Sequence, residues 1–417
     1  MSYLNERLPK TAIVTTTIYV PQAIEKYARN ARFYGHDPED VFFVVTGDKK
    51  TPAETAEFCA SVSRGGFRCH YLGVQDQEAY LAERFPELWN HLPFNSIQRR
   101  NISLLKAWEE GAETIITIDD DNWMLNHDFV RLHNIVGQRP ELPAFETSSG
   151  WFNVCSLLEE AHGTPFYHRG YPREERWNEA SVFSSVAPVT RRVSVNAGLW
   201  LDDPDIDAMT RLERPIVVRG MKESAPARFS LQPGTWSPFN SQNTALMRDV
   251  IPAYFLSPYV GRYDDIWPSY LVVRIAEHLG DVISYGLPLL RQKRNEHVLW
   301  KDLDNERVGM LLTGQLCSIL RGIELKGTTY HDCYGELVRE LPRAWQPEAK
   351  WTDAMKAARE GWIEGMAVWH GVFEKLQKGS KASGLERLGG VLAGSRNVLD
   401  PDEQAVLGLS TISSEAK

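Results

Sequence analysis

The chain has 417 residues, of which 43% are hydrophobic and 24% are charged, and its formal net charge is −9 at pH 7. This composition is typical of a globular protein with a large core, and the negative charge argues against a nucleic-acid-binding protein that depends on broad phosphate neutralisation. No apolar run is long enough to predict a transmembrane helix, and the first residues lack the layout of a secretory signal. With five dispersed cysteines and no CxxC pair, these features predict a cytoplasmic protein with reduced thiols.

The beginning of the chain alternates between buried strands and helices. Residues 11–20 (TAIVTTTIYV), 41–48 and 67–74 are apolar runs that predict strands. Residues 23–35 and 52–66 have helical spacing and end in glycine. This alternation predicts an open, mostly parallel α/β sheet.

The next unit is the clearest one. Residues 97–111 (IQRRNISLLKAWEEG) predict a helix that begins after an N-cap at Asn95 or Ser96 and ends at Gly111. The strand TIITID follows, and it leads into three consecutive aspartates, residues 119–121. Open α/β sheets bind ligands at the carboxyl ends of their strands, so the triplet lies where a ligand is expected.

The remainder of the chain is organised differently. From about residue 150 the sequence is rich in aromatic residues, Pro and Gly, which predicts shorter strands and long loops. Helical patterns follow residue 300, and weakly patterned sequence follows residue 378. We therefore expect an α/β domain over residues 1–300, a helical extension over 301–378 and a loosely ordered tail over 379–417.

The aspartate triplet is a candidate metal site. If the strand continues through it, Asp119 and Asp121 point to one face and Asp120 points to the other. Two carboxylates offer hard oxygen ligands for Mn²⁺ or Mg²⁺ that carries substrate phosphates, and the cation would relieve their mutual repulsion. An Asp-rich turn is the structural alternative, which the position at the end of a strand disfavours.

Three further charged residues are candidate ligands for a nucleotide. Arg99 and Arg100 lie beside a helix N-terminus and can receive an anion, although a solvated helix face is the alternative for one of them. Asp48 follows a strand and can accept a hydrogen bond from a base edge, although Gly-Asp is also a common turn.

The motif GRYDDIW supplies a second pair of acids. Asp264 or Asp265 can act as a base or hold a sugar hydroxyl, while a helix N-cap is the structural alternative for one of them. His297 can supply a further metal ligand, although a lone histidine is more often structural.

Several motifs resemble known families. Asp-x-Asp at a strand end resembles the GT-A glycosyltransferases, which have a Rossmann-like nucleotide-sugar-binding domain. RGYP (169–172), GLWLDDPDIDA (198–208) and GRYDDIW (261–267), in this order, resemble the reversibly glycosylated polypeptides, the plant UDP-arabinopyranose mutase family. This resemblance covers roughly residues 115–290, and residues 291–306 are similar to glycosyltransferases related to the plant STELLO proteins.

The resemblance implies a GT-A domain with a nucleotide-binding half (1–125) and an acceptor and sugar half (126–300). It implies that the triplet 119–121 holds metal and UDP-sugar. It also implies that Arg169 is the arginine that becomes reversibly glycosylated.

Two further contacts with the nucleotide sugar are expected, from Thr16 and from Trp200. The family has a histidine shortly after GLP, where this chain has Gln292. A histidine ligand would therefore have to come from His297.

The leading functional hypothesis is a metal-dependent glycosyltransferase that moves a sugar from a UDP-sugar to a hydroxyl acceptor. One alternative is a pyranose/furanose mutase or self-glycosylating protein that uses Arg169, and another is a non-catalytic sugar-nucleotide-binding scaffold. A nucleotidyltransferase is disfavoured because no Gly-rich, Lys-containing phosphate loop follows the first strand. The C-terminal helices are a candidate contact for a homo-oligomer.

Overall fold

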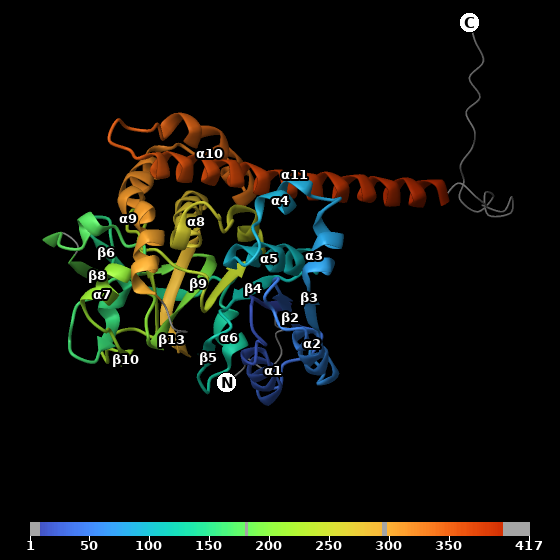
Figure 1. Cartoon of the computed structure of the whole chain (residues 1–417), viewed down its shortest axis with the longest axis horizontal. Helices are drawn as coiled ribbons and strands as arrows, with labels where there is room; N and C mark the ends of the chain where they lie inside the picture. Colours follow the sequence, from blue (N-terminus) through green and yellow to red (C-terminus); the bar gives the residue numbers. More distant parts are fainter. Residues whose placement is uncertain (1–8, 180–181, 294–297, 395–417) are drawn as a thin grey trace, which may run out of the picture. The chain divides into compact units, whose positions relative to one another are not determined.

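The computed structural model describes residues 9–179, 182–293 and 298–394, with side chains as far as residue 379 (Figure 1). The contacts divide the chain into two units, residues 1–370 and 371–417. The sheet and the helices that pack on it belong to the first unit.

The amino-terminal half is a parallel sheet in the order β3-β2-β1-β4. Its strands are β1 (Thr11–Thr16), β2 (Val41–Thr46), β3 (Cys69–Leu72) and β4 (Thr114–Thr117). Its helices are α1 (Ala23–Phe33), α2 (Glu54–Arg64), α3 (Val74–Leu81), α4 (Pro86–His91) and α5 (Arg100–Glu109). β1 is shorter than predicted because the Thr17 hydroxyl accepts from the amide of Tyr19 and so turns the chain.

The helix before β4 starts and stops at the predicted signals. A short 3₁₀ turn, η1 (Ile97–Arg99), precedes α5, and the Ser96 hydroxyl caps it by accepting from the amide of Gln98. Gly111 adopts a left-handed φ of 81° after α5, as the glycine stop requires. α5 then packs against β1 and β2, which fixes the loops at their carboxyl ends.

The second half contains short strands, as the sequence predicted, and also two long ones, β9 (Val193–Asp202) and β13 (Val282–Gln292). β12 (Thr244–Met247) pairs antiparallel with both β4 and β9, and β13 runs parallel to β9. β9 is buried along almost its whole length, although its apolar residues alternate with Ser194, Asn196 and Gly198. Register shifts near Gly286 and Pro288 bend β13.

Smaller elements complete the sheet, which has 13 strands within the described residues. They are β5 (Asn122–Met124), β6 (Glu141–Thr147), β7 (Leu158–Glu160), β8 (Phe183–Thr190), β10 (Val218–Met221) and β11 (Arg228–Leu231), with the short helices α6 (Phe129–His133) and α7 (Ala208–Glu213). The 3₁₀ turns η2 (Val154–Leu157), η3 (Arg173–Glu175), η5 (Arg248–Ala253) and η6 (Gly261–Tyr263) lie between them.

Four longer helices follow. They are α8 (Ile266–Leu279), α9 (Leu299–Gly322), α10 (Tyr330–Ala344) and α11 (Asp353–Gly394). α9 and α10 pack against α8 (Figure 1), where Trp267, Trp345 and Trp362 form a fully buried aromatic cluster. α11 continues to Gly394, past the start of the predicted tail.

The predicted α/β class is confirmed: a mixed sheet with a parallel amino-terminal half and flanking helices, followed by further helices. All five cysteines are free thiols, as the sequence predicted. Among the helices that the structure describes, none has the length and apolarity that a bilayer span requires.

Replacing Trp345 tests the contribution of the aromatic cluster. Its ring is fully buried and its centroid lies 5.5 Å from that of Trp267 and 5.9 Å from that of Trp362. Trp345→Ala should lower the free energy of unfolding in urea by about 3–5 kcal/mol, because it leaves a cavity. Trp300→Ala is the control: that ring is 68% exposed, and its loss should change the free energy by less than about 0.5 kcal/mol. Equal effects of the two substitutions would contradict the packing argument.

Candidate active site

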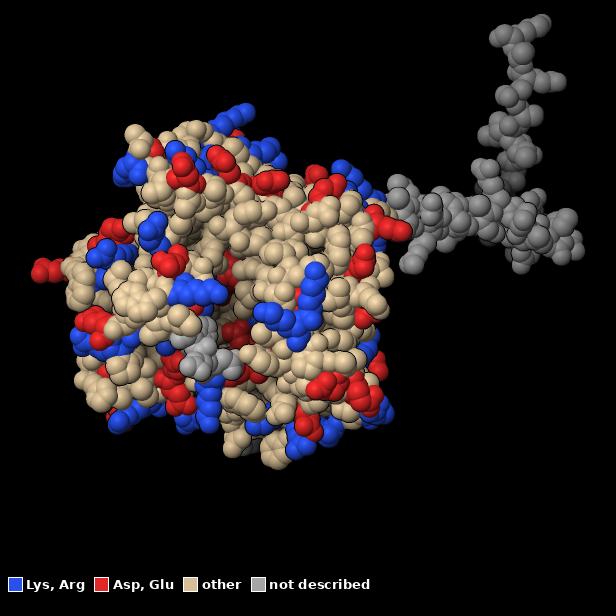
Figure 2. Space-filling model, viewed as in Figure 1, with Lys and Arg blue, Asp and Glu red and all other residues tan. Residues whose placement is uncertain are grey.

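A cavity of about 390 Å³ lies at one edge of the sheet. The parallel strands β1, β4, β9 and β13 end at this edge, and the antiparallel β12 begins there. Figure 2 shows acidic side chains at the bottom of a hollow with basic side chains around it. The lining residues are Thr16, Ile97, Gln98, Arg100, Asp119, Asp120, Asp121, Arg169, Asp205, Ser241, Gln242, Gly261, Arg262, Asp264, Asp265, Gln292 and Asn305.

All three aspartates of the triplet line this cavity, so the predicted opposite orientation of Asp120 is wrong. β4 ends at Thr117, and the triplet forms a turn in which the Asn122 side chain accepts from the amide of Asp119 at 2.8 Å. The alternation of a strand therefore does not apply to these residues. Asp120 accepts from the Thr17 hydroxyl at 2.5 Å, and burial raises the pKa of its carboxyl.

Arg100 neutralises part of this negative charge. Its guanidinium lies 2.5 Å from Asp119 and donates to the hydroxyl of Ser241 at 2.7 Å. Gln242 donates to the other oxygen of Asp119. Although burial opposes a charged guanidinium, Asp119 outweighs it and the pKa of Arg100 is raised. Arg100 thus lies where the sequence expected an anion-binding arginine.

Arg99 does not line the cavity. Its Nε atom instead donates to the side-chain oxygen of Gln77 at 2.7 Å, and its guanidinium carbon lies 4.1 Å from the ring centroid of Phe94. Burial lowers its pKa to about 10. Its place in the fold is structural, which is the alternative that the sequence left open for one of the two arginines.

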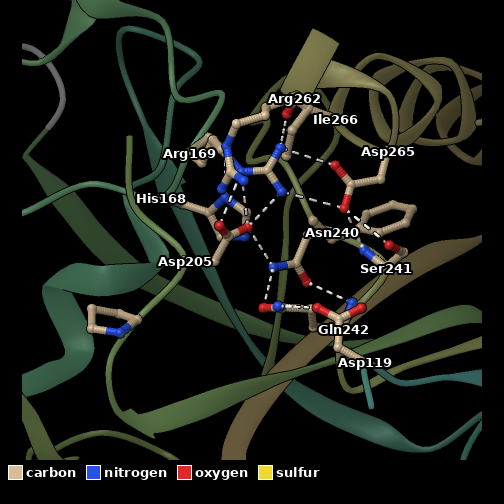
Figure 3. A network of polar contacts seen from close by, with 12 residues as sticks. Asp119, His168, Arg169, Asp205, Asn240, Ser241, Gln242, Arg262, Asp265 and Ile266 are labelled. Carbon is tan, nitrogen blue, oxygen red and sulfur yellow. Dashed lines mark hydrogen bonds and ion pairs between the residues drawn. The ribbon is translucent and has the colours of Figure 1, made fainter. Parts of the chain in front are cut away.

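Arg169 is the centre of a buried ionic network (Figure 3). Its guanidinium pairs with Asp205 at 2.8 Å and with Asp265 at 3.1 Å, and it also donates to the carbonyl of Arg262. Asn240 donates to Asp205 at 2.7 Å. Three segments far apart in the sequence therefore meet at one guanidinium.

Gly170 allows Arg169 to reach this position. Its φ is 88°, and a side chain there would overlap the Cγ2 atom of Ile266, the first residue of α8. The carbonyl of Gly170 accepts from the Tyr270 hydroxyl at 2.9 Å, which ties the turn to the same helix.

The pairing of Arg169 limits its chemistry. Nε and both terminal nitrogens all donate to oxygens, and the two carboxylates outweigh burial to raise its pKa well above the ordinary value. A protonated, fully bonded guanidinium has no free lone pair for attack on a sugar. In this arrangement Arg169 holds Asp205 and Asp265 in place.

Asp264 and Asp265 are adjacent in the chain but lie in different environments. Asp265 accepts from Arg169 and from the amide of Ser241 at 2.9 Å. Asp264 accepts from Gln98 at 2.8 Å, and burial, followed by the charge of Asp265, raises its pKa to about 7. When the environments of two neighbouring acids separate their pKa values, one of them commonly serves as the acid or base of a reaction.

The other predicted residues have mixed positions. Thr16 lines the cavity, whereas Asp48 and Trp200 do not. Asp48 instead accepts from the amide of Ser96 at 3.2 Å, and Trp200 is buried in β9. His297 lies outside the described residues.

The side chains around the triplet can serve as part of the ligand set of a divalent cation, with phosphate oxygens as the other ligands. No three His, Cys, Asp or Glu residues within the described ranges form a complete metal site. However, the Oε1 atom of Gln292 is buried and accepts no hydrogen bond from any described residue, and Gln292 pairs in register with Asn122, next to Asp121. Carboxylates, an amide oxygen and substrate phosphates together are suitable ligands for Mg²⁺ or Mn²⁺.

Sequence reasoning gave no role as candidate site residues to nine of the lining residues: Ile97, Gln98, Asp205, Ser241, Gln242, Gly261, Arg262, Gln292 and Asn305. Gln98 and Asp205 lay inside motifs that were recognised, QRRN and GLWLDDPDIDA, so a signal was available. Ser241 and Gln242 precede β12 with no local pattern, and only the sheet pairing brings them here.

Comparisons with known proteins give a consistent result. The model of the family described as reversibly glycosylated polypeptide matches residues 110–372. UDP-arabinopyranose mutase 1 of Arabidopsis thaliana is 27% identical over 318 residues, which are 71% of this chain and 84% of that protein. The probable UDP-arabinopyranose mutase 1 of Pisum sativum is 28% identical over 322 residues, with 71% and 84% covered. The structure of S. aureus TarS 1-349 in complex with UDP-GlcNAc aligns over 89% of this chain and 92% of that chain, at 10% identity and a TM-score of 0.37, which is too low to bear on the site.

The raised pKa of Asp264 predicts a pH-dependent stability. With a pKa of about 7 when folded and 3.8 as its ordinary value, Asp264 binds a proton in the folded state that the unfolded chain releases. Stability from this group is therefore lost as pH rises between these values. The unfolding midpoint of Asp264→Asn, measured by calorimetry, should rise relative to the unsubstituted protein from about pH 4 to about pH 7 and then run parallel to it. Asp353→Asn, at a fully exposed side chain, should show no such trend, and a flat difference for Asp264→Asn would contradict the raised pKa.

Proposed function

The chain belongs to the reversibly glycosylated polypeptide family, and on that basis we propose that it is an enzyme that binds a UDP-sugar and interconverts the pyranose and furanose forms of the sugar. The single observation that carries this proposal is the position of Asp264. This carboxyl, with its pKa of about 7, lies in the same cavity as the aspartate triplet. The relatives named as UDP-arabinopyranose mutases support the substrate class.

The proposed reaction needs one group that both accepts and returns a proton. The bond between C1 and the ring oxygen breaks, and a bond forms between C1 and another hydroxyl oxygen of the same sugar. The incoming hydroxyl loses a proton and the outgoing ring oxygen gains one, so no external acceptor is consumed. A carboxyl with a pKa near neutrality suits both transfers, and we assign this role to Asp264.

Asp265 and Arg169 are proposed to position this acid. Asp265 remains paired with Arg169, so its negative charge is fixed next to Asp264 and helps to hold the pKa of that carboxyl near 7. We propose this role for Arg169 in place of glycosylation, because its guanidinium is already fully bonded.

The diphosphate is proposed to lie at the triplet. Asp119, Asp121 and Gln292 would hold Mn²⁺ or Mg²⁺, which supplies positive charge to offset the charge of the diphosphate. Arg100 lies beside Asp119 and can donate to a phosphate oxygen. Asp120 is bonded to Thr17 and would support the turn.

Glycosyl transfer to a hydroxyl acceptor is the second candidate. The hollow in Figure 2 opens to solvent, so an acceptor can approach the same cavity, and Asp264 can deprotonate it. The domain limits at residues 300 and 378, a homo-oligomer through the C-terminal helices and a cytoplasmic location stay predictions. A non-catalytic scaffold is disfavoured because the acidic triplet and the base candidate share one cavity.

A product assay decides between these functions. The pure protein is incubated with Mn²⁺ and a panel of UDP-pentoses and UDP-hexoses without acceptor, and products are separated by chromatography. We expect a furanose isomer of one UDP-sugar, lost by at least about 100-fold in Asp264→Asn because proton transfer fails. Glycosyl transfer would be favoured instead if the UDP-sugar stays unchanged without an acceptor and its sugar is transferred when hydroxyl acceptors are added. A sugar adduct in intact-mass spectra that Arg169→Lys abolishes would contradict the positioning role of Arg169.

The proposed cation site is tested by binding. Asp121→Asn should remove the Mn²⁺ dependence of UDP binding in calorimetry, because one carboxylate ligand becomes a neutral amide. Gln292→Ala should weaken Mn²⁺-dependent binding to a smaller extent. Asp249→Asn is the matched control, since that side chain is 62% exposed and does not line the cavity. Unchanged Mn²⁺ dependence in Asp121→Asn would exclude it as a ligand.

A further inference from the structure

A second cavity, of about 520 Å³, is larger than the candidate active site and shares no lining residue with it. It lies between β7, the first residues of β8 and the segment from Gly163 to Asn178. Figure 1 shows this end of the sheet, where β6, β8, β10 and α7 are grouped. The proposed reaction at the aspartate triplet makes no use of it.

Aromatic rings form much of its wall. Phe166, Tyr167, Tyr171 and Phe183 line it. The ring centroids of Tyr167 and Tyr171 lie 5.1 Å apart. Phe166 and Tyr171 are almost fully buried, so Tyr167 and Phe183 offer the accessible apolar rings of this cavity.

A third cavity, of about 360 Å³, lies on the other side of the same segment. It shares residues 164–167 and Arg176 with the second cavity. It adds Trp177, whose side chain is 83% exposed and whose ring centroid lies 6.4 Å from that of Tyr167. Two adjoining cavities with an exposed tryptophan beside them suit an extended ligand rather than a single small molecule.

The charged groups of the second cavity are already compensated. The carboxylate of Glu160 accepts from the amides of His162 and Thr164, each at 2.8 Å. Arg176 pairs with Asp207 at 2.6 Å. The remaining charged residues of the lining, Glu159 and Lys222, have opposite signs. The cavity therefore suits a neutral ligand.

Two polar atoms of the lining still need hydrogen-bond partners. The hydroxyl oxygen of Ser156 and the Nε atom of Arg176 are buried, and neither bonds to any residue within the described ranges. A buried polar atom without a partner is costly, so a ligand that satisfies both gains that free energy on binding. Hydroxyl groups can donate to Ser156 and accept from Arg176.

We propose that these two cavities form a binding site for a neutral oligosaccharide, separate from the UDP-sugar site. Sugar rings would stack on Tyr167 and Trp177 through their C–H faces, and sugar hydroxyls would bond Ser156 and Arg176. Flat apolar faces and isolated hydrogen-bonding atoms, beside the compensated charges of the second cavity, are the chemistry of a carbohydrate ligand. Only one residue separates Tyr167 from Arg169, so the saccharide lies beside the loop that enters the active site. The inference does not depend on the proposed function.

Calorimetric titration with xylohexaose, cellohexaose and maltohexaose tests the site, in the presence of UDP and Mn²⁺ so that the first cavity is occupied. At least one oligosaccharide should bind. Trp177→Ala and Ser156→Ala should each weaken binding by at least about fivefold, through loss of stacking and of a hydrogen bond. Trp300→Ala, which removes an exposed tryptophan that lines none of these cavities, should bind as the unsubstituted protein does. Thermal unfolding confirms that each variant is folded.

Four results would overturn the proposal. The first is no heat of binding from any of the three oligosaccharides at millimolar concentration. The second is equal affinity in folded Trp177→Ala, Ser156→Ala and unsubstituted protein. The third is binding that a parallel titration without UDP detects and that UDP abolishes, which would place the oligosaccharide in the first cavity. A neutral, tyrosine-rich hexapeptide that binds more tightly than every oligosaccharide would also refute it in favour of a protein partner.

Discussion

The buried guanidinium of Arg169 between Asp205 and Asp265 is the interaction on which the active-site edge depends. It joins the turn at Gly170, the segment after β9 and the start of α8, and all three side chains are almost completely removed from solvent. Buried charges are tolerated only when paired, so loss of any one partner leaves the others uncompensated. Asn240 donates to Asp205, and the amide of Ser241 donates to Asp265, so the network includes residues that precede β12. Arg100 donates to Ser241 and pairs with Asp119, which connects the network to the aspartate triplet.

The cavity holds more acids than bases, and its electrostatics follow from that excess. Arg169 compensates Asp265, and Arg100 compensates Asp119. Asp264 has no ion pair among the described residues, and burial, followed by the charge of Asp265, raises its pKa to about 7. At Asp119 and Asp121 we propose that a divalent cation supplies further positive charge. Ion pairing and protonation thus both respond to the excess of negative charge in the cavity.

The segment from Gly163 to Asn178 connects the two regions to which we assign ligands. Tyr167 faces the second and third cavities, and Arg169 enters the first. The segment is anchored at Arg169 by ion pairs and at Gly170 by the Tyr270 hydroxyl, whereas Trp177 is largely exposed. This segment is therefore held in place at Arg169 and Gly170 and accessible to solvent at Trp177.

The sequence by itself determined the parallel strands, the helix stop at Gly111 and the acidic strand end, because periodicity, glycine and apolar runs act locally. Its motifs also pointed to Arg169, Asp264 and Asp265, which line the cavity in the structure. It could not separate Arg99 from Arg100, since a turn decides which one faces the cavity, and it misplaced Asp120 because β4 ends before the triplet. Only the tertiary structure decided the roles of Asp205, Ser241 and Gln242, because β9 and β12 bring them to the site through pairings with distant strands. Long-range sheet register leaves no local pattern in the chain.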